Sequence, residues 1–147
     1  MHRSTILLII LALLLGACNE GSQSTLESGT LTITDGTTEV TYTSENLQGL
    51  SLNEAAFGDI TYVGVKLKGL LENAGFVTAD IKAVKAVASD GYSANYDASI
   101  FLRDDVIVAY ATADGPLSTD DGQFRMVVPG EAGKLNVRML VTLQVIP

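Results

Sequence analysis

The side chains that could carry chemistry in this chain are few, and the two most reactive lie near its start. The chain has one histidine, His2, and one cysteine, Cys18. If residues 1–17 are removed as an export signal and Cys18 carries a lipid on its sulfur, neither an imidazole nor a free thiol remains. Catalysis by Ser-His-Asp or Cys-His groups needs an imidazole base, and zinc sites need histidine or cysteine ligands. We therefore expect neither such a catalytic group nor a metal site, which leaves carboxylates, lysine, tyrosine and hydroxyl groups for any reaction.

Two arginines, Arg125 and Arg138, stand out in so acidic a chain. The sequence has 17 acidic and nine basic residues, and one basic residue, Arg3, lies within residues 1–17. Residues 18–147 therefore carry a net charge of −9. Such a charge repels nucleic-acid phosphates, so no nucleic-acid partner is expected. The two arginines either form a pocket for a small anion or pair with carboxylates, and the sequence leaves both interpretations open.

The first residues have the parts of an export signal. Arg3 precedes an apolar run over residues 6–15, which ends in Leu15-Gly16-Ala17-Cys18. A positive start, an apolar core and a small-residue exit are typical of a secretory signal, and the run is shorter than the roughly 20 residues of a membrane-spanning helix. Its end matches the lipobox of bacterial lipoproteins, which predicts cleavage between Ala17 and Cys18 and lipidation of Cys18. The alternative is an ordinary signal peptide with an incidental cysteine.

A tether and one domain are expected to follow the signal. Residues 18–29 are polar and contain Gly and Ser, so we expect a flexible lipidated tether, and residues 30–147 are long enough for one globular domain. Two or three acyl chains on Cys18 would hold the protein at a membrane of the cell envelope, facing the periplasm or the exterior. Residue 19 is Asn rather than the Asp that retains lipoproteins in an inner membrane. In a cell with two membranes this favours the outer one.

Alternating and apolar patterns predict a domain made mainly of strands. Residues 30–34 and 39–43 alternate with period two around Asp35-Gly36, which predicts a hairpin. Helical spacing over 65–74, followed by Gly75, predicts one short helix. Helical turns are also expected at 44–47 and 97–102, a loop at 114–122, and strands at 60–63, 81–89, 106–111, 123–128 and 135–145. The segment 81–89 also suits a helix, and the last strand should place alternate residues from Leu135 to Val145 on one face.

Acidic residues in the predicted 114–122 loop raise the question of calcium. Asp114, Asp120 and Asp121 could supply oxygen ligands, but the EF-hand spacing, with Gly at its sixth and Glu at its twelfth position, is absent. The sequence therefore favours a solvated acidic loop over a calcium site.

Several short motifs occur in order between residues 41 and 146. They are Tyr62-x-Gly64-Val65-x-Leu67-x-x-Leu70-Leu71-x-x-Ala74-Gly75, Ala88-Ser89-Asp90-Gly91-Tyr92, Asp114-Gly115-Pro116-Leu117, Gly122-Gln123-Phe124-Arg125-Met126-Val127-Val128-Pro129-Gly130 and Val137-Arg138. In this order and spacing the chain resembles the molybdopterin-binding domain of the sulfite oxidase family of oxidoreductases. The resemblance implies an α+β fold with a mixed β-sheet and a few short helices. The family's final Val-Lys-Trp corresponds to Val137, Arg138 and Met139.

The same resemblance implies a pocket for a pterin or another small anion. Its residues would be Asp90, Tyr92, Arg125, Lys134 and Arg138. Enzymes of this family coordinate molybdenum through a cysteine in an earlier segment of the domain, and this chain has no cysteine other than Cys18. The resemblance therefore favours a short, exported, cofactor-poor relative. No cofactor is expected, with molybdopterin as the alternative.

One main hypothesis and two alternatives follow. The main hypothesis is a lipid-anchored envelope protein whose domain binds a small anionic ligand or an envelope protein partner, without molybdenum catalysis. The first alternative is a pterin-binding redox enzyme or an accessory subunit of a molybdenum oxidoreductase. The second is a structural envelope protein with a vestigial pocket. Whether the protein is an enzyme stays open at this point, and the missing metal-binding cysteine favours the answer that it is not.

Overall fold

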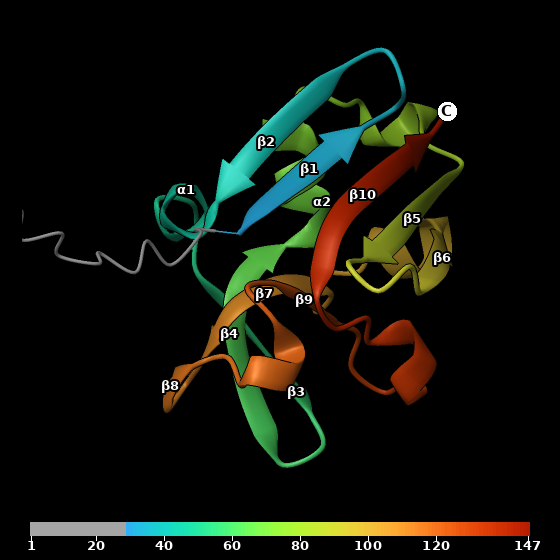
Figure 1. Ribbon diagram of the computed structural model, residues 1–147. Helices are drawn as coiled ribbons and strands as arrows, with labels where there is room; N and C mark the ends of the chain where they lie inside the picture. The colour runs from blue at the N-terminus through green and yellow to red at the C-terminus, as the bar shows by residue number, and fades with distance from the viewer. Residues whose placement is uncertain (1–28) are drawn as a thin grey trace, which may run out of the picture.

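Two β-sheets form the frame of the domain. The computed structural model describes residues 29–147, and the expected export signal and lipidation site at residues 1–18 lie outside this range, as does all of the expected tether but Gly29. Sheet A contains, in order across the sheet, β2 (Glu39–Thr43), β1 (Thr30–Thr34), β10 (Leu140–Ile146), β5 (Ala83–Ala88) and β6 (Ser93–Asp97). Sheet B contains β3 (Asn53–Phe57), β4 (Ile60–Lys66), β7 (Ile107–Thr112) and β8 (Gly115–Pro116), and β9 (Arg125–Val127) also pairs with β7. Figure 1 shows both sheets.

Short helices connect the strands. The α-helices are α1 (Ser44–Gln48), α2 (Leu67–Asn73) and α3 (Ala98–Phe101). The 3₁₀ helices are Thr78–Asp80, Thr119–Asp121 and Gly133–Leu135. Within residues 29–147, no helix is long and apolar enough to span a membrane.

The pairing of the strands is mixed. β1 runs parallel to β10, and the other neighbouring strands of both sheets are antiparallel. Mixed sheets with a few short helices confirm the α+β fold that was expected from the sequence. The strands of a parallel pair need a long connection between them, and here that connection is nearly the whole domain.

The main core lies between the two sheets and α2. It contains Leu31 and Ile33 of β1, Leu67 and Leu70 of α2, and Val108 of β7, all fully or almost fully buried. Burying a leucine or isoleucine side chain stabilises the fold by about 1.5–3 kcal/mol. This core fixes the inner face of sheet A and leaves its outer face to solvent.

Most predicted elements are confirmed, with small shifts at their ends. β1 and β2 form the expected hairpin, and Asp35 Oδ1 accepts hydrogen bonds from the backbone N–H groups of Thr37 and Thr38. The segment 81–89 forms a strand, β5, and not a helix. The helix predicted over 65–74 begins only at Leu67, because Val65 and Lys66 pair with β7 as the end of β4.

The strand predicted over 135–145 is wrong in its first half. Leu135 ends a 3₁₀ helix, and β10 begins at Leu140. Met139, directly before the strand, has φ 53°, which turns the chain and interrupts the alternation of faces. A register shift follows between Leu140 and Thr142, so the inward-facing residues of β10 are Leu140, Leu143 and Val145.

Candidate functional site

A cleft of about 700 Å³ brings together four of the five side chains predicted for the pocket. Asp90, Tyr92, Lys134 and Arg138 all line it. The fifth, Arg125, does not. A cleft of this volume is within the usual range of roughly 300–1,000 Å³ for small-ligand sites. We call it the cationic cleft, after Lys134 and Arg138.

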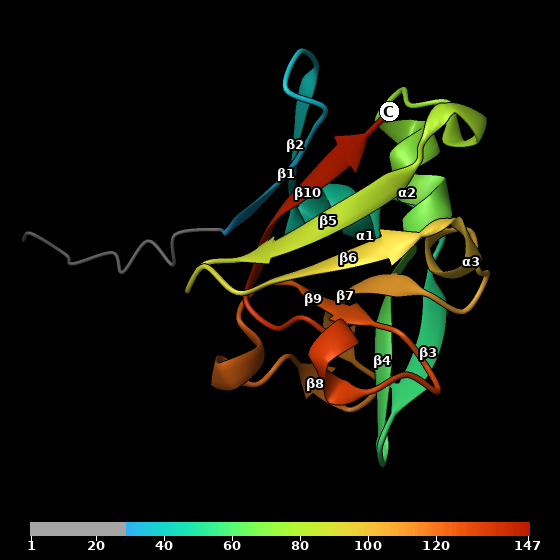
Figure 2. The same ribbon diagram turned by 90° about the vertical axis from the view of Figure 1, so that its right-hand side faces the viewer.

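Three separate segments form the walls of the cationic cleft. The turn between β5 and β6 contributes Asp90 and Tyr92, and the 3₁₀ helix Thr119–Asp121 contributes Asp120. The segment from the 3₁₀ helix Gly133–Leu135 to the start of β10 contributes Lys134 and Arg138. In Figure 2 the β5–β6 turn lies at the left edge of the domain, and the 3₁₀ helices Thr119–Asp121 and Gly133–Leu135 lie below it. The site is therefore built from loops that the two sheets bring together.

Two tyrosines hold the segment that carries Lys134. The Tyr92 hydroxyl donates to the carbonyl oxygen of Lys134 at 2.7 Å, and the Tyr96 hydroxyl donates to that of Leu135 at 2.6 Å. Tyr96 is fully buried, and this burial raises the pKa of its hydroxyl, so the group stays protonated and remains a donor. Tyr92 is 46% exposed and lines the cleft.

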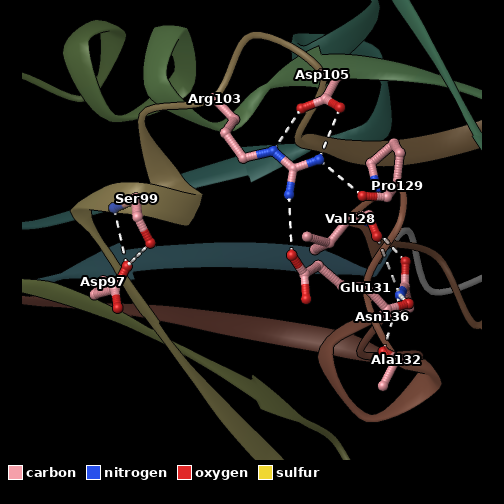
Figure 3. Close-up of polar contacts among 9 residues, drawn as sticks. All are labelled: Asp97, Ser99, Arg103, Asp105, Val128, Pro129, Glu131, Ala132 and Asn136. Atoms are coloured by element: carbon pink, nitrogen blue, oxygen red, sulfur yellow. Dashed lines mark hydrogen bonds and ion pairs between the residues drawn. The ribbon is translucent and has the colours of Figure 1, made fainter.

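The loop between β9 and the last 3₁₀ helix is held from within by a buried amide (Figure 3). The side-chain oxygen of Asn136 accepts from the backbone N–H of Val128 at 2.7 Å. Its side-chain nitrogen lies 3.2 Å from the carbonyl oxygen of Ala132 and 3.4 Å from those of Val128 and Glu131. One side chain therefore closes the loop on itself.

Arg103 holds the same loop from outside (Figure 3). Its guanidinium donates to the carbonyl oxygen of Pro129 at 2.7 Å and pairs with Glu131 at 3.3 Å. It also forms a bidentate ion pair with Asp105, with Nε donating to Oδ1 at 2.9 Å and Nη2 donating to Oδ2 at 2.8 Å. The hydrogen bond from Arg103 lowers the pKa of Asp105. Lys134 thus projects from a backbone that is fixed on several sides before any ligand arrives.

The charges that line the cationic cleft are not paired with one another. Lys134 and Arg138 are both exposed, and neither forms an ion pair with a carboxylate of residues 29–147. Asp90 and Asp120 line the same cleft, and Asp90 Oδ1 accepts from the backbone N–H of Tyr92 at 2.9 Å. The cleft therefore offers two cations that can bind an acid group and two carboxylates that can accept hydrogen bonds from hydroxyls.

Arg125 lies elsewhere, in a buried ion pair. It is 4% exposed, and its Nη1 donates to Asp121 Oδ1 at 2.6 Å and to the Tyr62 hydroxyl at 2.8 Å. Its guanidinium carbon lies 4.4 Å from the centre of the Tyr62 ring and 5.6 Å from that of Phe57. Of the two interpretations that the sequence left open, the structure supports carboxylate pairing for Arg125, and Arg125 is not part of the pocket.

The same pair accounts for one of the acidic residues considered for calcium. Asp121 is buried, bonded to Arg125, and accepts a hydrogen bond from the Ser118 hydroxyl at 2.9 Å. Across residues 29–147, no three or more acidic, histidine or cysteine side chains are grouped so that they could hold a metal ion.

Met139 is a cleft residue that the sequence reasoning missed. It lines the cationic cleft, is 38% exposed and has φ 53°, the left-handed region that residues other than glycine rarely adopt. Its N–H donates to the carbonyl oxygen of Asp121 at 2.8 Å, and its carbonyl oxygen accepts from the N–H of Ser89 at 2.9 Å. Such strain concentrates at functional sites. The signal in the sequence was its position beside Arg138, where the related family has a Trp.

Comparison with known proteins gives the family. The family described as "Oxidoreductase molybdopterin binding domain" matches residues 25–147. The chain is 36% identical over 108 residues to mitochondrial sulfite oxidase of Drosophila melanogaster, covering 67% of this chain and 19% of that protein. Its fold is similar to the crystal structure of the sulfane dehydrogenase SoxCD from Paracoccus pantotrophus, with a TM-score of 0.68 at 21% identity, over 80% of this chain and 38% of that one. The chain spans less than half the length of each of these relatives. Because the family model matches residues 25–147, the chain belongs to the oxidoreductase molybdopterin-binding domain family.

Proposed function

We propose that this protein is a lipid-anchored protein of the cell envelope whose domain binds a small anionic ligand in the cationic cleft, without molybdenum catalysis. The observation that carries the proposal is the pair Lys134 and Arg138, two exposed cations on a fixed backbone in a strongly acidic domain. A preorganised site loses less entropy on binding than a mobile one, so its affinity is higher.

The donor set of the described residues does not fit the metal of the family's cofactor. Residues 29–147 contain neither cysteine nor histidine, and the resemblance implies a cysteine thiolate as the molybdenum ligand. The phosphate of a pterin cofactor is a different matter, because Lys134 and Arg138 suit any phosphate, sulfate or carboxylate group. The proposed ligand is therefore defined by its acid group and not by a metal.

Titration calorimetry on the full chain tests the proposal. Inorganic phosphate, sulfate and sulfite are the probes, and Arg138→Gln is the variant. A hydrogen bond to a charged group is worth about 1.5–3 kcal/mol, so Arg138→Gln should weaken anion binding roughly ten-fold or more. Lys85→Gln is the matched control, because Lys85 lies on β5 outside the cationic cleft. Equal weakening by both variants, or no binding to the unmodified chain, contradicts the proposal and leaves a structural role.

The anchor is a separate part of the proposal and has its own test. Leu15-Gly16-Ala17-Cys18 supports lipidation of Cys18, and the membrane would then be contacted through the lipid. Each buried methylene of an acyl chain contributes about 0.8 kcal/mol, so Cys18→Ser should move the protein from the membrane to the aqueous fraction, with any uncleaved signal leaving only a weak hold on the membrane. Mass spectrometry of the N-terminus identifies the lipid. Unchanged membrane association of Cys18→Ser at moderate salt contradicts the lipid anchor.

A pterin-binding redox enzyme or accessory subunit is the second candidate, and the family match favours it. The protein is purified from its own source, denatured in acid and oxidised, and the fluorescence of released pterin is measured. Stoichiometric pterin together with stoichiometric molybdenum in elemental analysis would replace the first proposal with this one. A blank spectrum removes this candidate.

A further inference from the structure

A second hollow, of about 460 Å³, lies beside the cationic cleft on the outer face of sheet A. Thr32 of β1 is the register partner of Thr142 of β10, so these two hydroxyl side chains share one face of the sheet. Thr30, two residues before Thr32 on β1, lies on the same face. Ser89 and Gln123 complete the polar lining. We call this hollow the hydroxyl groove.

The hydroxyl groove differs from the cationic cleft in charge. No charged residue lines it, whereas the cleft is lined by Asp90, Asp120, Lys134 and Arg138. Within residues 29–147, the side chains of Thr30, Thr32, Thr142, Ser89 and Gln123 form no hydrogen bond with another protein group. Their hydroxyl and amide groups are therefore free to bind the uncharged polar groups of a ligand.

Met139 joins the two hollows. It lines both of them, and its backbone is fixed between Asp121 and Ser89 by the two hydrogen bonds described above. Two neighbouring segments also contribute residues to both hollows. In the first, Asp90 lines the cleft and Ser89 lines the groove. In the second, Asp120 lines the cleft and Gln123 lines the groove. A ligand that extends beyond the cleft would cross Met139 and enter the groove.

The chemistry of the two hollows points to one class of occupant. An acid group fits Lys134 and Arg138, and hydroxyls next to it fit the acceptor oxygens of Asp90 and Asp120. The half-exposed Tyr92 ring and the Met139 side chain offer apolar surface to the C–H face of a sugar ring. An uncharged, hydroxyl-rich continuation then meets the hydroxyl groove.

We infer that the cationic cleft and the hydroxyl groove form one extended site for an acidic oligosaccharide, with its acid sugar in the cleft and an uncharged sugar in the groove. This inference rests on the proposed function, since it names the ligand class of the same cleft. Met139 is the contact over which the chain of sugars passes.

Three sugars test the length of the site by calorimetry on the full chain: glucuronate, the disaccharide glucuronosyl-(β1→4)-glucose, and cellobiose. A few extra hydrogen bonds should make the acidic disaccharide bind roughly ten-fold more tightly than glucuronate. Cellobiose, which lacks the acid group, should bind most weakly. Equal affinity for glucuronate and the acidic disaccharide overturns the inference.

The paired variant Thr32→Val with Thr142→Val tests the groove directly. Valine keeps the shape and suits a strand, so the fold is retained. The variant should weaken binding of the acidic disaccharide roughly two- to ten-fold and leave glucuronate binding unchanged. Thr41→Val is the matched control, because Thr41 is also a register partner of Thr32 but lies outside the groove. Equal weakening of both sugars, or weakening by Thr41→Val, overturns the inference.

The binding results distinguish a failure of the extended site from a failure of the proposed anion binding. If phosphate and glucuronate bind and their binding depends on Arg138, but the disaccharide gains nothing, the proposed function stands and the extended site is wrong. If neither phosphate, sulfate, sulfite nor glucuronate binds the full chain, the proposed function and the extended site both fail.

Discussion

Arg125 and Arg138 are the same residue type in the same acidic domain, and the structure places them in opposite surroundings. Arg125 is buried, paired with Asp121 and stacked beside Tyr62. Arg138 is exposed in the cationic cleft and pairs with no carboxylate of residues 29–147. The first charge is neutralised inside the protein, and the second has no ion partner among residues 29–147.

The comparison shows that an arginine in a binding motif is not by itself a binding residue. Asp121 lies on the 3₁₀ helix that forms one wall of the cleft, and its carbonyl oxygen accepts from the N–H of Met139. The Arg125–Asp121 pair therefore lies behind the cleft wall and ties it to sheet B through Tyr62. One arginine shapes the site, and the other is presented in it.

Replacing Arg125 should have the largest effect. Arg125→Met leaves the Asp121 carboxylate buried without its cation, and breaking a buried pair in this way costs about 3–5 kcal/mol. Urea denaturation followed by circular dichroism measures the free energy of unfolding. The double variant Arg125→Met with Asp121→Asn is the control and should recover part of the loss, because it leaves no unpaired charge. A single-variant loss under about 1 kcal/mol would mean that the pair does not stabilise the domain.

Asn136→Ala should have the next largest effect. It removes the acceptor of the buried Val128 N–H, and an unsatisfied buried group costs about 1–3 kcal/mol. The loop that carries Lys134 should loosen, so hydrogen exchange in residues 128–136 should speed up while exchange in α2 changes less. Asn95→Ala, at an exposed site on β6, is the control. Unchanged exchange in the loop would show that Arg103 and the tyrosines suffice to hold it.

Arg138→Gln should leave stability nearly unchanged. An exposed side chain without an ion partner contributes little, so the change in the free energy of unfolding should stay within about 0.5 kcal/mol. The same urea experiment measures it beside Arg125→Met. A loss comparable to that of Arg125→Met would remove the distinction between the two arginines and make Arg138 a structural residue.

The half-exposed pair Arg103–Asp105 should also have a small effect, and this effect should depend on pH. Because Arg103 lowers the folded-state pKa of Asp105, the pair stabilises the domain above the unfolded pKa, 3.8, and this contribution is lost as pH falls through the lower folded value. Asp105→Asn should therefore be less stable than the unmodified chain at neutral pH and equal to it in strong acid. Half-exposed pairs contribute under about 1 kcal/mol, so a larger difference would contradict this assignment.

The sequence predicts best where one local signal determines the structure. The Asp35-Gly36 turn with its alternating flanks predicted the first hairpin, and the helical turn expected at 97–102 is α3, which Asp97 caps. β3 and β6 were not predicted. Asn53–Phe57 has little alternation, and Ser93–Asp97 alternates only through Ala94 and Tyr96, so both segments become strands by pairing with β4 and β5. Tertiary pairing, which a local pattern cannot show, decides such strands.

The residues of the site likewise include some that the sequence predicted and some that it did not. The motif residues Asp90, Tyr92, Lys134 and Arg138 meet at one cleft, although they come from distant segments. Arg125 was misplaced because its partner Asp121 was counted as part of a solvated loop. Met139 and Asn136 were missed because a left-handed backbone and a buried amide depend on the surrounding loops, and the alternation over 135–145 imitated a strand there.

The place of β10 between β1 and β5 has a consequence for how the chain folds. The hairpin β1–β2 and the hairpin β5–β6 have no common neighbour until residues 140–146 are available to lie between them. Sheet A therefore cannot close until residues 140–146 have been made, and pairing across so long a stretch makes folding slow.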